Sequence, residues 1–283
     1  MHTDTAPPCH HRPRRPLGVA LAAMLLLASA TPADADQPLW ELGAGAGALV
    51  LPHYRGSAQN HRWLLPIPYV VYRGDILRSD REGTRAVLLD TELLDVDLSF
   101  DGSPPTRSSD NRARSGLHDL AATLEFGPNV NVRLGKGAGW KLNLSLPLRA
   151  AFAAESQLKS LGWTFAPVLN LDARWQGWNL GLQGGPQAAS RSYNAYFYDV
   201  PTGGTTPMRP AYAARSGYAG WGVATSATRR VGDWWLAGFW RYDSVAGATF
   251  AGSPLVMQRS NQSVGLALSW VFKVSETRVP DPR

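Results

Sequence analysis

Hydrophobic and polar residues alternate with a period of two along most of the chain after residue 38. In residues 140–150, WKLNLSLPLRA, Trp140 and the leucines point one way, whereas Lys141 and Arg149 point the other. This alternation is typical of a β-strand with one apolar and one polar face. The apolar face of such a strand packs in the core of a soluble sandwich or contacts lipid, and the alternation alone leaves both open.

The same pattern recurs in segments that are separated by turn residues. They are 39–50, 63–73, 92–100, 124–134, 140–150 and 163–175, followed by WNLGLQG, YAGWGVATSATR, WWLAGFWRY and SVGLALSWVF. Within 63–73 the pattern predicts one apolar face, made of Trp63, Leu65, Ile67, Tyr69 and Val71. No long amphipathic helix competes with these segments, which indicates an all-β chain.

Charges of both signs and amide side chains occupy the polar faces of these strands. In a soluble sandwich this face meets water and usually carries Lys and Glu, whereas in a transmembrane barrel it lines a lumen of mixed polarity. The mixture favours the barrel. The residues that we expect to line the lumen are Asp95, Asp97, Glu125, Arg133, Lys141, Arg149, Asp172 and Arg174.

Turn lengths and tryptophan positions favour the same fold. Short turns, at 135–139, 176–177 and 230–233, alternate with long polar ones at 51–62, 101–116, 152–161, 187–215 and 247–260. Short periplasmic turns and long outer loops are characteristic of outer-membrane barrels, and tryptophans at strand ends form girdles at headgroup level. We assign to these girdles Trp40, Trp140, Trp175, Trp178, Trp234 and Trp270 at the short-turn end, and Trp63 and Trp163 at the other.

We therefore predict a single antiparallel transmembrane β-barrel over residues 36–272, with its apolar faces toward lipid. The barrel has about 12 strands if residues 74–91 fold as a short hairpin, and 10 otherwise, because a spanning strand needs roughly 9–11 residues. Prolines inside strands remove backbone donors and predict local breaks or kinks. They are Pro66, Pro68, Pro128, Pro147 and Pro167.

Residues 1–35 have the composition of a cleaved Sec signal peptide. A basic segment, HHRPRRP, precedes the apolar run 17–30, and small residues before the predicted cleavage point at Ala35 complete the signal. The apolar run is shorter than the roughly 20 residues that a spanning helix needs. The single cysteine, Cys9, lies in this segment, so we expect neither disulfides nor thiolate chemistry in the mature chain.

The net charge of +6 is small, and the 28 Lys and Arg residues are scattered along the chain. A nucleic-acid partner would require a clustered basic patch, so none is expected. The signal peptide and the barrel pattern together predict the outer membrane of a Gram-negative bacterium. The expected partners there are outer-membrane lipids, lipopolysaccharide and the barrel assembly machinery.

Short motifs along the mature chain resemble the MltA-interacting protein (MipA/OmpV) family of outer-membrane proteins. In order they are Pro52-x-Tyr54-x-Gly56-Ser57, Leu65-Pro66-x-Pro68-Tyr69, Tyr72-Arg73-Gly74, Arg114-Ser115-Gly116, Asp119-Leu120, Thr123-Leu124-Glu125-Phe126-Gly127-Pro128, Arg241-Tyr242, Ser253-Pro254-Leu255-Val256 and Trp270-Val271-Phe272. The resemblance rests on the order and spacing of these motifs and covers essentially the whole mature chain.

The resemblance implies an outer-membrane barrel and a non-enzymatic scaffold. The family's named member links a lytic transglycosylase, which cleaves murein (peptidoglycan), to a murein synthase. Other members are described as adhesins or general outer-membrane proteins, so a passive solute pore or an adhesin is the alternative. We expect no cofactor and no metal, because the histidines have no paired metal-ligand spacing.

A lipid-modifying enzyme of the outer membrane is a third hypothesis. A base and a nucleophile are available in His53 with Ser57, or in His118 with Asp119 and Ser115. Such residues must converge in space to act together, which the sequence cannot establish.

The C-terminal strand and the residues after it give the last expectation. Phe272 ends the strand and is the candidate signal for the assembly machinery. The polar segment 273–283 follows it without alternation, so we expect a poorly ordered periplasmic tail.

Overall fold

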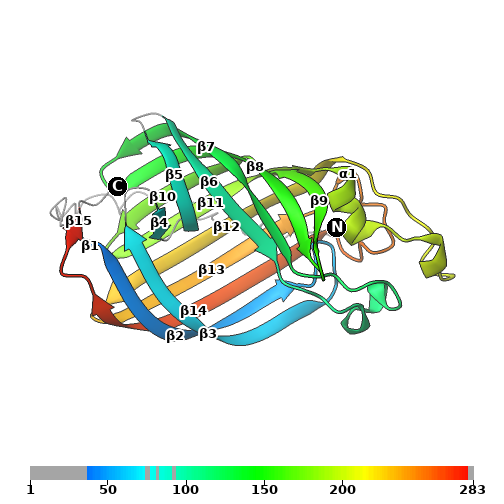
Figure 1. Ribbon diagram of the computed structural model, residues 1–283, viewed down its shortest axis with the longest axis horizontal. Helices are drawn as coiled ribbons and strands as arrows, with labels where there is room; N and C mark the ends of the chain where they lie inside the picture. Colours follow the sequence, from blue (N-terminus) through cyan, green and yellow to red (C-terminus); the bar gives the residue numbers. More distant parts are fainter. Residues whose placement is uncertain (1–36, 74–76, 81–82, 91–93, 280–283) are drawn as a thin grey trace, which may run out of the picture. The chain divides into compact units, whose positions relative to one another are not determined.

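A computed structural model describes residues 37–73, 77–80, 83–90 and 94–279, most of which are β-strand (Figure 1). The long strands are β2 (Trp40–Pro52), β3 (Asn60–Arg73), β6 (Leu94–Ser103), β7 (Thr123–Gly137), β8 (Trp140–Ala154), β9 (Leu158–Phe165), β10 (Val168–Trp175), β11 (Trp178–Ala189), β12 (Gly217–Val231), β13 (Trp234–Ser244) and β14 (Ser260–Val274). The short elements are β1 (Gln37–Pro38), β4 (Leu77–Asp80), β5 (Gly83–Asp90), β15 (Arg278–Val279) and helix α1 (Arg191–Tyr198). No helix within these ranges is long and apolar enough to cross a membrane.

The long strands form one antiparallel sheet that closes on itself. β14 pairs with β2, with Val264 opposite Val50, and so joins the last long strand to the first. At the far end of the sheet, β8 and β11 each pair with both β9 and β10. β9 and β10 therefore act as one strand that is broken at Ala166–Pro167, where a strand proline predicted a break. The predicted closed barrel is confirmed.

The strand count follows from the same pairing. The sheet has 13 strands, and counting β9 and β10 as one gives a wall of twelve. The predicted short hairpin is present, since β4 pairs with β5 from Leu77 opposite Ala86 to Asp80 opposite Gly83. The count that includes this hairpin is thus the correct one.

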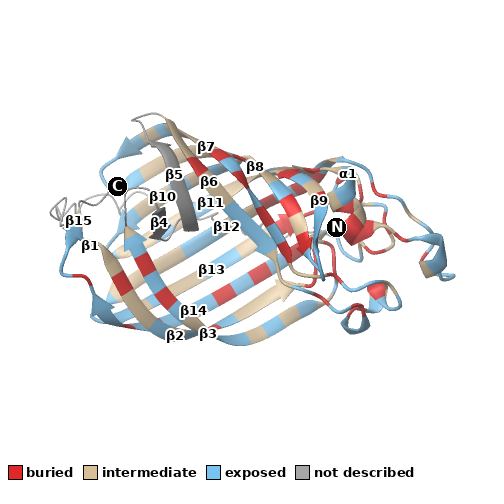
Figure 2. Ribbon diagram, viewed as in Figure 1, coloured by how far each residue is buried: buried red, intermediate tan, exposed pale blue. Residues whose placement is uncertain are grey.

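Directly opposite residues on neighbouring strands share a face, so the register assigns every side chain to the inside or the outside. The outer face carries exposed apolar side chains, such as Leu148 and Leu266. The inner face carries buried polar ones, such as Asp97 and Ser269. Figure 2 shows this alternation of exposed and buried residues along the strands. An apolar outer band of this kind is what a barrel wall presents to lipid.

β3 is the strand whose faces the sequence pattern assigned wrongly. Its Tyr69 lies opposite Gly43 and donates a hydrogen bond to the inward Glu41 (3.4 Å). Leu65 and Ile67 therefore also point inward, whereas Leu64, 80% exposed, points outward. Both faces of this strand are rich in apolar residues, so the alternation could not distinguish them.

The connections also follow the predicted division into short and long. One end of the barrel has the two-residue turns 138–139, 176–177 and 232–233, and the other end has the long connections 53–59, 104–122, 190–216 and 245–259. The loop expected at 152–161 is only 155–157, because β8 continues to Ala154 and β9 begins at Leu158.

The segment after Phe272 is more ordered than expected. β14 continues to Val274, and β15 pairs with β1, with Gln37 opposite Val279. The backbone amides of Ser275 and Leu39 donate to the carbonyls of Trp40 and Thr277 (2.9 Å each). The expectation of a loose tail is therefore wrong for 273–279, whereas 280–283 lie outside the described residues.

The long connections pack into a hydrophobic core of their own. It is built around α1 and includes Tyr54, Leu120, Phe197, Phe250 and Leu255. The same cluster contains the inward wall residues Ala151, Ala153 and Ala189 of β8 and β11, so the loops fold against the inside of the barrel mouth. Figure 2 shows the buried residues concentrated around α1 at this end.

Candidate functional site

A ladder of hydrogen bonds crosses the inner face of β6, β7, β8 and β10. Asp97 is 2% exposed and accepts from the amides of Asn129 (3.2 Å) and Asn131 (2.9 Å). Ser145 donates to Asn131 (2.5 Å) and accepts from Asn170 (2.9 Å). Each amide thus meets an oxygen on the next strand, which satisfies polar groups that are buried in the wall. We call Asp97, Asn129, Asn131, Ser145, Arg149 and Asn170 the polar wall.

Glu125 connects this wall to the loop core. Its carboxylate accepts from Thr164 of β9 (2.7 Å) and from Tyr193 of α1 (2.7 Å). Arg149, one strand further, donates to Ser99 (2.8 Å) and contacts Asp101 (3.4 Å). The alternation of residues predicted that Glu125 and Arg149 point inward. It could not predict their hydrogen-bond partners, because these lie in other elements.

The other predicted lumen residues also lie on the inner face by register. Asp95 lies opposite Asn131, Arg133 opposite Asn143, Lys141 opposite Asp172, and Arg174 opposite Asn179. The structure therefore brings all eight predicted residues to one side of the wall, from β6 to β10.

A second charged group, which sequence reasoning did not single out, lies near the loop end of β13. Arg241 donates twice to Asp243 (2.6 and 2.8 Å), and Arg55 of the first long connection contacts the same carboxylate (3.4 Å). Arg55 also donates to the carbonyl of Ala219 (2.8 Å). One loop arginine thus ties the first connection to β12 and β13.

Near the short-turn end, Glu41 of β2 pairs with Arg73 of β3 (2.7 Å) and with Arg230 of β12. Arg73 also donates to the carbonyl of Pro38 (2.7 Å). This cluster anchors the start of the described chain inside the barrel.

Most of the predicted girdle residues lie on the outer face. By register these are Trp40, Trp140, Trp163, Trp175, Trp178, Trp234 and Trp270. Trp63 differs, because it lies opposite the inward Leu49 and stacks on His61 (4.5 Å between ring centroids). Trp221, 41% exposed, instead shares the loop end of the outer face with Trp163. Phe272, the candidate assembly signal, is exposed and packs edge to face on Trp270.

Arg114 is a fully buried cation at the centre of the loop core. Its guanidinium donates to the carbonyls of Phe197 (2.7 Å) and His118 (3.1 Å) and lies over the ring of Tyr54 (5.8 Å). Burial lowers the pKa of Arg114 and raises the pKa of Tyr54 to about 12. These contacts identify Arg114 as the residue that fixes the connection 104–122 against α1.

The structure brings His53 and Ser57 to the same Asn111 side chain, which lies between them. The Asn111 amide bridges His53 (3.1 Å) and Ser57 (3.0 Å), and Ser57 has no exposed surface. The pKa of His53 is lowered, first by burial and then by the nearby His61. Ser57 is thus a buried hydroxyl that is held by hydrogen bonds with Asn111 and Gln59.

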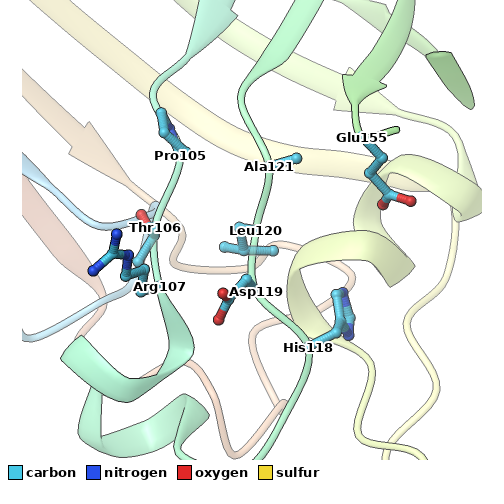
Figure 3. Close-up of a pocket in the computed structure, with 8 residues that line it drawn as sticks. All are labelled: Pro105, Thr106, Arg107, His118, Asp119, Leu120, Ala121 and Glu155. Carbon is cyan, nitrogen blue, oxygen red and sulfur yellow. The ribbon is translucent and has the colours of Figure 1, made fainter. Parts of the chain in front are cut away.

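His118 and Asp119 line a cavity of about 460 Å³ between the second connection and Glu155 (Figure 3). Figure 3 shows their side chains pointing apart. The His118 ring packs against Tyr196 (5.7 Å), whereas Asp119 accepts from the backbone amide of Ser108 (2.7 Å). Burial and the nearby Arg114 lower the pKa of His118. No group of His, Asp and Glu suited to a metal ion occurs among the described residues.

The closed wall, the apolar outer band and the ordered polar interior define a transmembrane β-barrel protein. The chain belongs to the family of the MltA-interacting protein MipA, whose pattern matches residues 44–272. The resemblance drawn from the short motifs is thus confirmed, and the protein resides in the outer membrane. A search of curated proteins gave no significant match.

Several solved outer-membrane proteins are similar to the chain at low identity. A bacterial polysaccharide outer membrane secretin aligns with 8% identity and a TM-score of 0.43, over 84% of this chain and 99% of the other. An outer membrane channel from Pseudomonas putida aligns with 12% identity and a TM-score of 0.40, over 86% and 97%. Outer membrane phospholipase A from Escherichia coli aligns with 10% identity and a TM-score of 0.33, over 82% and 93%.

Proposed function

We propose that the protein is a non-enzymatic scaffold that holds a lytic transglycosylase, and with it a murein synthase, at the inner surface of the outer membrane. The observation that carries this proposal is the family match over 44–272, because the family is named for its interaction with MltA. The scaffold's ligands are proteins, so it needs neither a catalytic centre nor an open channel.

The loop end supports a scaffold over a passive pore. The loop core packs against inward alanines of the wall, and Arg114 at its centre is completely buried. An open channel needs a continuous water-filled path, which packed side chains at the mouth oppose. The separated His118 and Asp119, and the buried Ser57, likewise support a protein without hydrolytic activity.

The short-turn end is the surface that we assign to the partner. It carries the ordered β1–β15 pair and the exposed basic side chains of Lys136, Lys273 and Arg278, against the acidic Asp233 and Glu276. A surface with this excess of basic charge attracts an acidic partner surface and accelerates its association.

Co-purification from detergent-solubilised envelope tests this proposal. Lys136→Glu and Lys273→Glu change exposed charges at the short-turn end, and Arg112→Glu is the matched control in an exposed part of the second connection. We expect the wild type and Arg112→Glu to recover a lytic transglycosylase and the double Lys variant to lose it. Recovery of no murein enzyme by the wild type, together with steady conductance in planar bilayers, would favour the pore instead.

A further inference from the structure

Two histidines lie against each other where the first long connection, 53–59, meets the second, 104–122. His53 begins the first connection and His61 lies at the start of β3, with 4.1 Å between their ring centroids. His61 stacks in turn on Trp63 (4.5 Å between ring centroids). His53 is only 9% exposed, and neither ring has a part in the scaffold role proposed above.

Both rings are bonded to the second connection. The Thr106 hydroxyl lies 2.9 Å from His61 Nε2 and donates to the carbonyl of His53 (3.0 Å). The Asn111 amide lies 3.1 Å from His53 Nδ1. Thr106 and Asn111 are each 1% exposed, whereas Gln59 adds two hydrogen bonds between the connections at the exposed surface (2.9 and 2.6 Å). The two histidines are therefore part of a buried joint between the connections.

The contacts of Asn111 fix the protonation state of His53. The side-chain oxygen of Asn111 accepts from the backbone amide of Arg114 (3.3 Å), and a backbone N–H can only donate. The group of Asn111 that faces His53 is thus its NH2, which also donates to Ser57 (3.0 Å). His53 Nδ1 must accept, so this ring is neutral and carries its proton on Nε2. A second proton, at Nδ1, would face a donor and break the contact.

His61 can take up a proton without losing its own hydrogen bond, and its charge would then act on His53. The Thr106 hydroxyl gives its one proton to the His53 carbonyl, so it accepts from the Nε2–H of His61. A proton taken up at Nδ1 of His61 leaves this bond intact and places a positive charge beside the His53 ring. Protonation of both rings therefore adds repulsion between like charges whose ring centroids are 4.1 Å apart.

The surroundings of His53 favour the neutral ring as well. Burial and the neighbouring His61 lower the pKa of His53, and the exposed Asp110 of the second connection opposes them. Asp110 is also the charged side chain that acts on His61. Because the pKa of His53 lies below its ordinary value of about 6.5, the closed joint is stabilised by the neutral ring. This stabilisation is complete above about pH 6.5 and is lost as the pH falls through the lowered pKa.

From this arrangement we propose that His53 and His61 form an acid-sensitive latch, which holds the second connection on the first at neutral pH and releases it when both rings are protonated. The first connection stays fixed to the fourth, 245–259, because the backbone amides of Met257 and Gln258 donate to the Gly56 carbonyl (2.8 and 3.1 Å). Release thus moves the segment around Thr106 away from the first and fourth connections and loosens the loop core. The latch lies at the loop end and does not depend on the partner-binding role proposed for the short-turn end.

A distance between the second and fourth connections reports the state of the latch. The chain's only cysteine is Cys9, so spin labels are placed at Arg107→Cys and Ala246→Cys, both exposed positions, in a Cys9→Ser background. The protein is reconstituted into phospholipid vesicles, and double electron–electron resonance measures the distance between the labels from about pH 8 down to about pH 5, a range that includes the ordinary pKa of histidine. The heat-dependent gel shift checks that each variant is folded.

Three substitutions separate the latch from other titrating groups. His53→Asn keeps an acceptor oxygen for Asn111, and His61→Gln keeps a donor for Thr106, but neither new side chain titrates. His118→Gln is the matched control, because His118 lies in the second connection and packs against Tyr196, outside the pair.

We expect one short distance at about pH 8 and a second, longer distance whose population rises severalfold as the pH falls below about 6.5. The double variant His53→Asn/His61→Gln should keep the short distance throughout, whereas His118→Gln should behave as wild type. His61→Gln alone should release the connection at a lower pH and over a broader range, because one proton fewer drives the opening.

A wild-type distance that does not change with pH would overturn the inference. An acid-induced change that persists in the double variant, or that disappears in His118→Gln, would overturn it as well. If His53→Asn does not fold, His61→Gln alone decides, since a release with the wild-type midpoint and steepness would show that the pair is not the latch.

Discussion

The two sides of the barrel interior differ in how their inward side chains are held. On the polar wall, Asp97, Asn131 and Ser145 are joined by hydrogen bonds of 2.5 to 2.9 Å across neighbouring strands. On another part of the inner face the side chains are apolar, and we call this set the apolar wall: Leu49, Trp63, Leu65, Ile67, Trp235 and Phe239. There, Leu65 and Phe239 remain substantially exposed although they point inward. The inward side chains of the polar wall are thus joined by hydrogen bonds, whereas those of the apolar wall are only partly covered.

The strands on the two sides of the barrel also differ in how completely they pair with their neighbours. β7 and β8 pair along most of their length next to the polar wall, from Thr123 opposite Ala153 to Gly137 opposite Trp140. Among the described residues, β3 pairs with β2 from Asn60 to Tyr72 and with β4 at Tyr72 and Arg73. Substitutions on the two sides should therefore have different effects on the stability of the barrel.

The largest expected effect concerns the two faces of β8 beside the polar wall. Leu144→Arg puts a charge on the outer, lipid-facing side, which costs about 2–4 kcal/mol near the bilayer midplane. Asn143→Arg puts the same charge on the inner face, opposite Asn170, where it is solvated. We expect only Leu144→Arg to prevent refolding into vesicles, as measured by the heat-dependent gel shift. Equal losses from the two variants would contradict the assignment of faces.

Removal of the carboxylate at the centre of the polar wall should have the next largest effect. Asp97→Ala leaves the amide of Asn131 without its acceptor and removes one of the two acceptors of Asn129, which costs about 1–3 kcal/mol. Asp97→Asn retains one acceptor oxygen and should cost less. Denaturant titration of the folded barrel in vesicles measures both, and a neutral Asp97→Ala would show that the ladder does not stabilise the wall.

A smaller effect is expected where the polar wall holds the loop core. Tyr193→Phe removes one hydrogen bond to Glu125 while preserving the ring, at about 1 kcal/mol. The helix α1 should then open more readily, so limited proteolysis should cut the connection 190–216 faster than in wild type. Ser192→Ala, at an exposed position of the same helix, is the control and should leave the rate unchanged.

The smallest stability change is expected on the apolar wall. Leu65→Ser removes a side chain that is already 44% exposed, so it should lower the free energy of unfolding by less than about 1 kcal/mol. The buried Val71 on the same strand face provides the contrast, since Val71→Ser removes a packed side chain and introduces an unpaired hydroxyl. A loss at Leu65→Ser as large as that at Val71→Ser would mean that the apolar wall is packed as tightly as a core.

The sequence by itself determined the class of the fold and most of its faces. Alternation in β6, β7, β8 and β10 placed all eight predicted charged residues on one face, because only one face of each of these strands is apolar. Residues 74–91 are too short for two full crossings, so the sequence left a count of about twelve strands with a short hairpin there, or ten without it, and β4 and β5 form that hairpin. The short motifs were sufficient to identify the family.

Tertiary structure decided the features that depend on contacts between distant segments. The core around Arg114 joins loops whose sequences carry no period, and β15 is held by pairing with β1 some 240 residues earlier. On β3, alternation establishes which residues share a face, but it cannot say which face is inside when both are apolar. The register with β2 settled this, because Tyr69, Ile67 and Leu65 lie opposite glycines, and a Cβ at Gly43 or Gly47 would lie 3.1 Å from Tyr69 Cβ or 2.3 Å from Ile67 Cδ1. That room, created by side chains absent from one strand, is why the apolar residues of its neighbour point inward.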